Sequence, residues 1–321
     1  MKICVIGCGR WGSLITWYLS EKKALDVTLY GRESSETMQR FISERKNDLL
    51  TLPESVRLST DISSASAADV IIISINSQGL SSLMAELAPL ELKNKIFVLC
   101  MKGIDIATGK RLSEIASEAI DPSNRVAVWL GPGHVQEFYA GIPNCMVIDS
   151  DDSEVKRLLV DTFQGELIRF YYGEDLLGNE IGAAAKNVIG IAAGMLDGKG
   201  LSTLKGALMS RGTREVARLI AAMGGNELSA YGLCHLGDYE ATVFSRFSHN
   251  RAYGEALVRG EGFTKLAEGH YTAKAIVELA KRYGVDMPIC RCVYGIIYEG
   301  LDVSEGLAEL FGRSTKSEFY K

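Results

Sequence analysis

The sequence has no apolar run long enough to cross a bilayer. Its longest apolar stretches, such as DVIIISI and KIFVLCM, are much shorter than the roughly 18 to 20 residues of a spanning helix. The opening MKICVIGCGR has too short an apolar stretch, and no small-residue cleavage site, for a secretory signal. We therefore expect a cytoplasmic protein without a membrane partner.

Positive charge is outnumbered by negative charge and is not concentrated in one place. The net charge is −5, and the basic residues form no block or stripe of the kind that neutralises a phosphate backbone. This excludes nucleic acid as the expected partner and favours a small molecule. The seven cysteines show no repeated spacing, so we expect reduced, partly buried thiols and no metal site.

Two kinds of pattern divide the 321 residues. Up to residue 172, short β-rich runs alternate with helical segments, and several runs are apolar throughout, as is typical of a parallel sheet covered on both faces. The runs are KICVI, DVTLY, DVIIISI, KIFVLC, RVAVWL, NCMVID and ELIRFYY. Beyond them apolar residues recur at helical spacing and no strand is predicted. The sequence therefore predicts an α/β domain over residues 1–172 and an all-α domain over residues 173–321.

A glycine-rich turn follows the first run. KICVI leads into Gly7-Cys8-Gly9-Arg10-Trp11-Gly12, a G-x-G-x-x-G pattern, and a helical segment comes next. Glycines there permit a tight turn and a close backbone approach to a pyrophosphate, whose charge the helix N-terminus stabilises. Many strand–helix turns contain glycine without binding anything, but this context favours a dinucleotide site that includes Arg10 and Trp11. The first domain is thus predicted to be of the Rossmann type.

The end of the second run, DVTLYGRES, bears on which dinucleotide binds. An acidic residue there accepts hydrogen bonds from a ribose 2′-hydroxyl, whereas an arginine suits a 2′-phosphate. The chain has Arg32, followed by Glu33. This favours NADP, and a solvated Arg32 beside bound NAD is the alternative.

The apolar stretch GNEIGAAAKNVIGIAAGMLDG, residues 178–198, predicts a long helix with one lysine in its middle. Residues four apart share a helix face, so Gly182, Lys186, Gly190 and Gly194 form one stripe. One interpretation is close helix packing, with the lysine stem reaching to water. The other is a groove left open for a substrate, with one ammonium projecting into it.

Polar groups elsewhere favour the second interpretation. The segment HLGDYEATVFSRFSHNRAYG, residues 235–254, has the hydroxyl and basic composition of an anion site. Lys102 follows the run KIFVLC, and open α/β sheets bind their ligands at the carboxyl ends of strands. Together these groups predict a small anionic substrate held against a nicotinamide.

The glycine turn and these segments, with LYGR, NSQ, KGI, GPGHVQE, LMSRGTREVARL, AEG and VDMPIC, closely resemble the NAD(P)-dependent glycerol-3-phosphate dehydrogenase family over almost the whole chain. The resemblance implies an active site between a Rossmann-type domain and a helical domain. It also implies that Lys186 is the general acid/base, assisted by Lys102 and Asp238. An ammonium in an apolar pocket beside a second cation should have a lowered pKa, and Asp238 should limit that shift.

Further roles are carried over from the family by position. The substrate residues so implied are Lys102, Gly131, Lys186, Asn187, Asp238, Thr242, Ser248, His249, Asn250 and Arg251. The cofactor residues are Gly7, Gly9, Arg10, Trp11, Gly12, Arg32, Lys102, Val135, His249 and Glu268.

Two histidines depart from the family pattern. His249 stands where the family has a phosphate-binding arginine, and a histidine offers fewer donors and only partial charge at neutral pH. His134 replaces a phenylalanine in GPGHV. Either Arg251 swings in to supply the missing guanidinium, or the substrate differs from dihydroxyacetone phosphate.

The resemblance implies an enzyme that interconverts dihydroxyacetone phosphate and sn-glycerol 3-phosphate with NADP or NAD, for glycerophospholipid synthesis. The expected partner is a small phosphorylated three-carbon substrate, and a homodimer is common in such proteins. One alternative is a related dehydrogenase with a different hydroxy or keto substrate. Another is a nucleotide-sensing protein that has lost catalysis.

Overall fold

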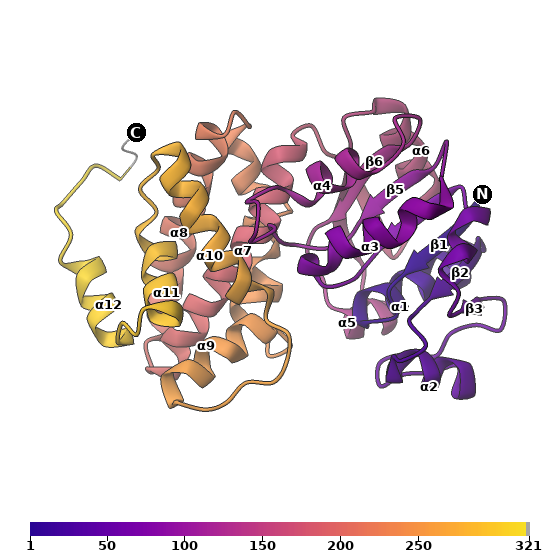
Figure 1. Ribbon diagram of the computed structural model, residues 1–321. Coiled ribbons are helices and arrows are strands. Elements are labelled where there is room, and N and C mark those ends of the chain that lie inside the picture. Colours follow the sequence, from indigo (N-terminus) through magenta and orange to yellow (C-terminus); the bar gives the residue numbers. More distant parts are fainter. Residues whose placement is uncertain (319–321) are drawn as a thin grey trace. The chain divides into compact units, whose positions relative to one another are not determined.

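The computed structural model describes residues 1–318, which form two compact units. One unit comprises residues 1–101 and 111–176, and the other comprises residues 102–110 and the described residues from 177 onward. Figure 1 shows strands in the first and helices in the second. No helix of the described residues is both long enough and apolar enough to span a membrane.

The first unit is built on one eight-stranded sheet. Its strands are β1 (Lys2–Ile6), β2 (Asp26–Tyr30), β3 (Arg57–Ser59), β4 (Val70–Ile73), β5 (Ile96–Leu99), β6 (Arg125–Leu130), β7 (Asn144–Asp149) and β8 (Ile168–Tyr172). Their order is β3-β2-β1-β4-β5-β6-β7-β8, and all neighbours are parallel except β6 and β7. Strand order reverses between β1 and β4, and ligands bind beside such a switch point, at the strand carboxyl ends.

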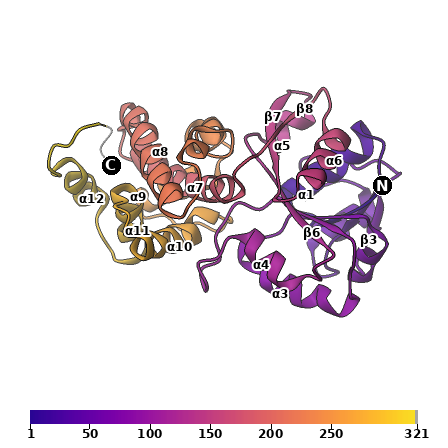
Figure 2. The same cartoon turned by 90° about the horizontal axis from the view of Figure 1, so that it is seen from above.

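Helices cover both faces of this sheet. They are α1 (Arg10–Trp17), α2 (Glu36–Glu44), α3 (Leu80–Leu87), α4 (Leu112–Ala119), α5 (Val135–Tyr139) and α6 (Ser153–Phe163). Figure 2 shows α3 and α4 on the opposite side of the sheet from α1 and α6. The apolar residues of α1, α2, α5 and α6 share one core with every second residue of the strands, such as Val5, Val70 and Ile72. This double cover explains why the central strands are apolar on both faces.

The second unit is helical. Its helices are α7 (Leu176–Gly198), α8 (Lys205–Ala222), α9 (His249–Arg259), α10 (Glu268–Tyr283), α11 (Pro288–Tyr298) and α12 (Val303–Phe311). Every residue of α7 from 178 to 196 is buried, so this helix forms the centre of the unit's core. Short helical turns at Leu236–Asp238 and Glu240–Phe244 connect α8 to α9.

The predicted fold class is confirmed, and so are the seven predicted strands. The prediction of a parallel sheet was incomplete in two respects. It missed β3, which has only three residues, and it missed the antiparallel pairing of β7 with β6. The seven cysteines are free thiols, and five of them are buried.

Candidate active site

The glycine turn joins β1 to α1, and its three glycines meet different demands. Gly7 has φ +113°, and a Cβ there would lie 2.2 Å from the Ser74 carbonyl oxygen at the end of β4. At Gly12 a Cβ would lie 1.8 Å from the Gly7 carbonyl oxygen. A Cβ at Gly9, which precedes α1, would meet nothing within 4 Å. Gly7 and Gly12 therefore close the turn, whereas Gly9 leaves its backbone open to a ligand.

The other side chains predicted for the cofactor differ in how firmly they are held. Arg10 donates to Gln136 Oε1 at 3.3 Å, and the Trp11 ring packs 5.9 Å from the ring of Phe138. Arg32 is largely exposed, with 69% of its side chain accessible, and lies 3.9 Å from Glu86. The exposed guanidinium is compatible with either form of the dinucleotide.

The loop after β6 carries three more residues that sequence analysis singled out. Gly131 has φ +130°, a conformation that side chains disfavour, and it lies against Met146 of β7. His134 precedes α5, and Val135 is the buried first residue of that helix.

Three charged side chains meet inside the helical unit. Asp238 Oδ2 lies 2.7 Å from Lys102 Nζ and 2.7 Å from Lys186 Nζ. Asp238 is 1% exposed and Lys186 is 6% exposed. We call Lys102, Lys186 and Asp238 the ion triad. Its residues come from three distant parts of the sequence, and all lie within the second unit.

The environment of Lys186 changes its pKa. Burial lowers the pKa, the nearby Asp238 carboxylate raises it, and the Lys102 ammonium lowers it again, leaving a pKa of about 8. The expectation that burial and a second cation lower this pKa, while Asp238 limits the shift, is confirmed. A pKa near the working pH suits a group that gives and takes a proton.

Thr242 and one oxygen of Asp238 complete the surroundings. Lys186 Nζ donates to Thr242 Oγ1 at 2.7 Å, and that hydroxyl donates to the Asp238 carbonyl oxygen at 2.7 Å. The second carboxylate oxygen, Asp238 Oδ1, is buried without a hydrogen-bond partner among the described residues. A buried acceptor without a donor costs about 1 to 3 kcal/mol, so a ligand donor would be favoured here.

Two asparagines predicted for the substrate join segments of the protein. Asn187 donates from Nδ2 to the Lys102 carbonyl oxygen at 3.1 Å. Asn250 donates to Asn187 Oδ1 at 3.0 Å and accepts from the Gly269 amide at 2.9 Å. Both amides thus hold α7, α9, α10 and the segment 102–110 together.

The start of α9 carries the remaining predicted residues. Ser248 caps the helix by accepting from the Arg251 amide, and His249 Nδ1 donates to the Leu266 carbonyl oxygen at 3.1 Å. The Arg251 guanidinium lies 2.7 Å from Asp197 and 2.5 Å from Glu255. A phosphate contact by Arg251 would therefore require it to leave two carboxylates. Glu268 is the first residue of α10.

The glycines of α7 do not leave a groove open, and that interpretation was wrong. A Cβ at Gly182 would lie 3.0 Å from His235 Cβ, one at Gly190 would lie 2.7 Å from Thr242 Cγ2, and one at Gly194 would lie 1.9 Å from the Arg251 carbonyl oxygen. Other residues of the chain occupy the space beside all three glycines. Close packing, the other interpretation, is what the structure has, and Lys186 is buried rather than extended to water.

Sequence analysis missed His235 and Tyr239, which lie on either side of Asp238 in the sequence. Both are 0% exposed, and they hydrogen-bond to each other. It also missed Glu215 of α8, whose carboxylate accepts from the Ile289 and Cys290 amides at the start of α11. Burial raises the Glu215 pKa to about 7. The available signal for Glu215 was that it occupies an apolar position in the helical pattern of α8, beside Val216 and Leu219.

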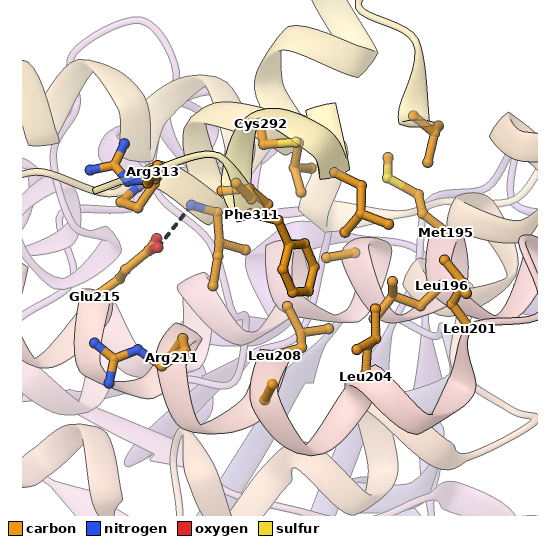
Figure 3. A pocket seen from close by; sticks show the side chains of 18 of the residues that line it. Met195, Leu196, Leu201, Leu204, Leu208, Arg211, Glu215, Cys292, Phe311 and Arg313 are labelled. Carbon is orange, nitrogen blue, oxygen red and sulfur yellow. Dashed lines mark hydrogen bonds between the residues drawn. The ribbon is translucent and has the colours of Figure 1, made fainter. Parts of the chain in front are cut away.

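A large apolar pocket of the helical unit contains no residue of the predicted site. It measures about 560 Å³ and is lined by α7, α8, α11, α12 and the residues after α12. Figure 3 shows Leu204, Leu208 and Phe311 pointing into it, with Glu215 at one end. The described residues include no group of three or more His, Cys, Asp or Glu side chains placed to hold a metal ion.

Comparisons with known proteins agree over the full length. Residues 2–156 match the N-terminus, and residues 175–308 the C-terminus, of NAD-dependent glycerol-3-phosphate dehydrogenase. The chain is 36% identical to glycerol-3-phosphate dehydrogenase [NAD(P)+] of Prosthecochloris aestuarii, covering 99% of this chain and all of the relative. The identity to the Chlorobium limicola enzyme of the same name is 33%, with both chains fully covered.

Solved structures agree as well. The crystal structure of glycerol-3-phosphate dehydrogenase from Coxiella burnetii superposes with a TM-score of 0.90 at 27% identity, covering 97% of this chain and 99% of that one. A D-mandelate dehydrogenase with NADH, at 15% identity and a TM-score of 0.63, shares the fold alone. The chain therefore belongs to the NAD-dependent glycerol-3-phosphate dehydrogenase family.

Proposed function

We propose that the protein interconverts dihydroxyacetone phosphate and sn-glycerol 3-phosphate, with a nicotinamide dinucleotide as the hydride carrier. The observation that carries this proposal is the ion triad, in which a buried ammonium with a pKa of about 8 is held by a carboxylate. The bound dinucleotide supplies or accepts the hydride. The chain's own residues bind the substrate and handle the proton.

Lys186 acts as the general acid in reduction. Negative charge develops on the substrate carbonyl oxygen as the hydride arrives, and the buried ammonium stabilises that charge and donates a proton. In oxidation the neutral amine takes the hydroxyl proton. Thr242, which accepts from Lys186 at 2.7 Å, and Asp238 orient the amine.

Lys102 and Asp238 also handle the substrate. Lys102 places a second positive charge beside Lys186 and favours an anionic ligand. The buried Asp238 Oδ1 accepts a hydrogen bond from a substrate hydroxyl, which removes the cost of its lacking a donor. Asn187 lies next to Lys186, and its amide fixes the position of the Lys102 backbone.

The phosphate group is assigned to the start of α9. Ser248, His249 and Asn250 lie there, where backbone amides and the helix dipole favour an anion. Arg251 is held by Asp197 and Glu255, and the other basic side chain of this set is His249, whose ring donates to the Leu266 carbonyl oxygen. This observation supports a second candidate function, a dehydrogenase of the same chemistry whose substrate carries a weaker anion than phosphate.

The dinucleotide is assigned to the glycine turn, with Val135 and Glu268 as further contacts. The open backbone at Gly9 fits a pyrophosphate, because a side chain there would occupy the space that the ligand needs. A preference for NADP over NAD is supported by the residue type, because an arginine rather than an acidic residue stands just after β2 and a guanidinium suits a 2′-phosphate. Residues 1–172, apart from Lys102, would then serve the cofactor and residues 173–321 the substrate, in a cytoplasmic and dimeric enzyme.

Steady-state kinetics test the proposal. Wild-type protein should oxidise NADPH or NADH with dihydroxyacetone phosphate at a KM between about 1 μM and 1 mM. Lys186→Ala should abolish turnover and leave dinucleotide affinity unchanged. Lys199→Ala is the control, because this exposed lysine directly follows the end of the same helix. Turnover by Lys186→Ala at the wild-type rate would remove Lys186 from the mechanism.

The two candidate substrates are separated by His249→Arg. If the natural substrate is phosphorylated, this variant should change kcat/KM for dihydroxyacetone phosphate less than tenfold. If the pocket has adapted to a weaker anion, wild-type KM should be far above the millimolar range and the arginine should lower it by an order of magnitude or more, because a guanidinium binds phosphate bidentately.

A further inference from the structure

His235 is fully buried in the helical unit and hydrogen-bonded at both ring nitrogens. Nδ1 lies 2.8 Å from the Gly182 carbonyl oxygen in α7, and Nε2 lies 2.8 Å from the Tyr239 hydroxyl. That hydroxyl in turn accepts from Thr213 Oγ1 of α8 at 3.4 Å. The two ring bonds connect the turn before α9 to the centre of the core.

The partners fix the protonation of this ring. A carbonyl oxygen can only accept, so Nδ1 carries the proton and Nε2 accepts from Tyr239. Burial lowers the His235 pKa to about 4, so the ring is neutral at pH 7. The charged groups that bear on it are Lys186, which lowers the pKa, and Asp238, which raises it. His235 is therefore a fixed donor and acceptor, not a proton carrier.

The Gly182 carbonyl oxygen, which accepts the bond from His235 Nδ1, lies about one helical turn before Lys186 in α7. In an α-helix the carbonyl of residue i accepts the amide of residue i+4, so Gly182 is the backbone partner of Lys186. Gly182 is also the position at which a Cβ would come within 3.0 Å of His235 Cβ. A side chain at 182 would push the imidazole away from the helix.

The turn that contains His235 also carries Asp238. The Asp238 amide donates to the His235 carbonyl oxygen at 3.0 Å, and Tyr239 is the next residue along the chain. His235 and Tyr239 thus bracket Asp238 and bond to each other. The carboxylate of Asp238 must lie within about 3 Å of Lys186 to form their charged hydrogen bond, so a small movement of this turn would break it.

We propose that His235 is a positioning residue, whose neutral ring ties the turn that carries Asp238 to the backbone of the helix that carries Lys186. Tyr239 is the second anchor, because its hydroxyl holds the ring in the orientation that Nδ1 needs. The inference rests on the proposed function of Lys186. It adds two residues that touch neither substrate nor cofactor, and it makes the geometry of the ion triad depend on them.

The experiment compares His235→Asn with His235→Leu. Asparagine Nδ2 can replace Nδ1 as donor to Gly182, whereas leucine fills similar space without a donor. We expect His235→Leu to lower kcat by about tenfold or more, since small misplacements at a reacting centre are costly. We also expect the alkaline limb of the reduction rate to move to lower pH, because Asp238 would support the Lys186 ammonium less. His235→Asn should recover most of both, and the dinucleotide Kd should not change in either variant.

A second pair of variants applies if His235→Leu does not fold. Tyr239→Phe removes one hydroxyl and keeps the ring, and it should move the same limb in the same direction. Tyr253→Phe is its matched control, because Tyr253 also pairs with a histidine of this unit, His270 at 3.0 Å, away from the ion triad. The control should leave the pH profile unchanged.

The pKa of Lys186 can be read directly by NMR titration of the labelled lysine side chain, which needs no turnover. If the wild-type protein is inactive toward dihydroxyacetone phosphate, the proposed function is overturned. The positioning role would still be supported if the Lys186 pKa shifts in His235→Leu and is restored in His235→Asn. Equal kcat, pH profile and Lys186 pKa in wild type and His235→Leu would overturn the inference. The inference would also be overturned if kcat fell in both His235 variants in proportion to their loss of unfolding free energy.

Discussion

Lys186 Nζ lies 2.7 Å from Asp238 Oδ2 in a part of the helical unit that excludes water from both side chains. Burial alone would favour the neutral amine, and the carboxylate counteracts this by stabilising the ammonium. The competition leaves a pKa of about 8, so both protonation states are accessible near neutral pH. One residue can then serve as acid in reduction and as base in oxidation.

The pH dependence of the two directions should therefore be opposite. Reduction needs the ammonium and should lose rate as the pH rises through about 8, while oxidation needs the amine and should gain rate over the same range. Lys102→Met removes a cation that lowers the pKa, so both limbs should move to higher pH. Profiles of kcat for the wild type and this variant measure the shift. A move to lower pH would contradict the arrangement described for the ion triad.

Gly9 and Gly12 should respond differently to alanine. Gly12→Ala places a methyl group 1.8 Å from the Gly7 carbonyl oxygen and should lower the free energy of unfolding by about 1 to 3 kcal/mol. Gly9→Ala meets no protein atom within 4 Å and should leave stability unchanged, but it should weaken dinucleotide binding by tenfold or more. Urea unfolding and fluorescence titration separate the two effects. Unchanged affinity in Gly9→Ala would place the pyrophosphate elsewhere.

Gly194→Ala should separate α7 from α9. Its Cβ would lie 1.9 Å from the Arg251 carbonyl oxygen, a backbone atom that a rotamer change cannot move. We expect a loss of about 2 to 3 kcal/mol in the free energy of unfolding. Gly206→Ala is the control, because that helical position in α8 has no atom within 4 Å of the added methyl. It should be neutral or gain up to about 1 kcal/mol. If Gly194→Ala and Gly206→Ala had equal free energies of unfolding, the close approach of α7 to α9 would contribute nothing to stability.

Glu215 should make stability fall as the pH rises. Its folded pKa of about 7 lies above its unfolded value of 4.5, so its contribution is full below pH 4.5 and is lost as the pH rises through 7. Glu215→Gln keeps an acceptor for the Ile289 amide and removes the charge. Urea unfolding at pH 5 and pH 8 should show a smaller difference in the variant than in the wild type, and an identical difference would exclude Glu215 as its source.

The sequence was sufficient where a local pattern determines the structure. The apolar runs predicted every long strand, because residues buried on both faces leave a continuous signal. The central lysine of α7 was found because a charge is rare in an apolar helix. β3 escaped because three residues with partly exposed side chains carry no periodicity.

Pairing over long distances could not be predicted in this way. Nothing local to α7 shows that its glycines meet His235, Thr242 and the backbone at Arg251. The same composition fits an empty face or a filled one. Arg251 was assigned to a substrate anion because the sequence does not reveal that Asp197, 54 residues earlier, lies 2.7 Å from it. These contacts depend on how the helices are assembled, which a single chain pattern does not encode.

The segment 102–110 leaves the sheet unit, supplies Lys102 and Ile104 to the helical unit, and returns the chain to α4. The helical unit is consequently made of two separate pieces of polypeptide. A fragment cut at residue 173 would lack one of the two ammonium groups that flank Asp238, together with the backbone carbonyl that Asn187 binds. A chimera of two relatives joined near residue 173 would likewise take Lys102 from one parent and Asp238 from the other.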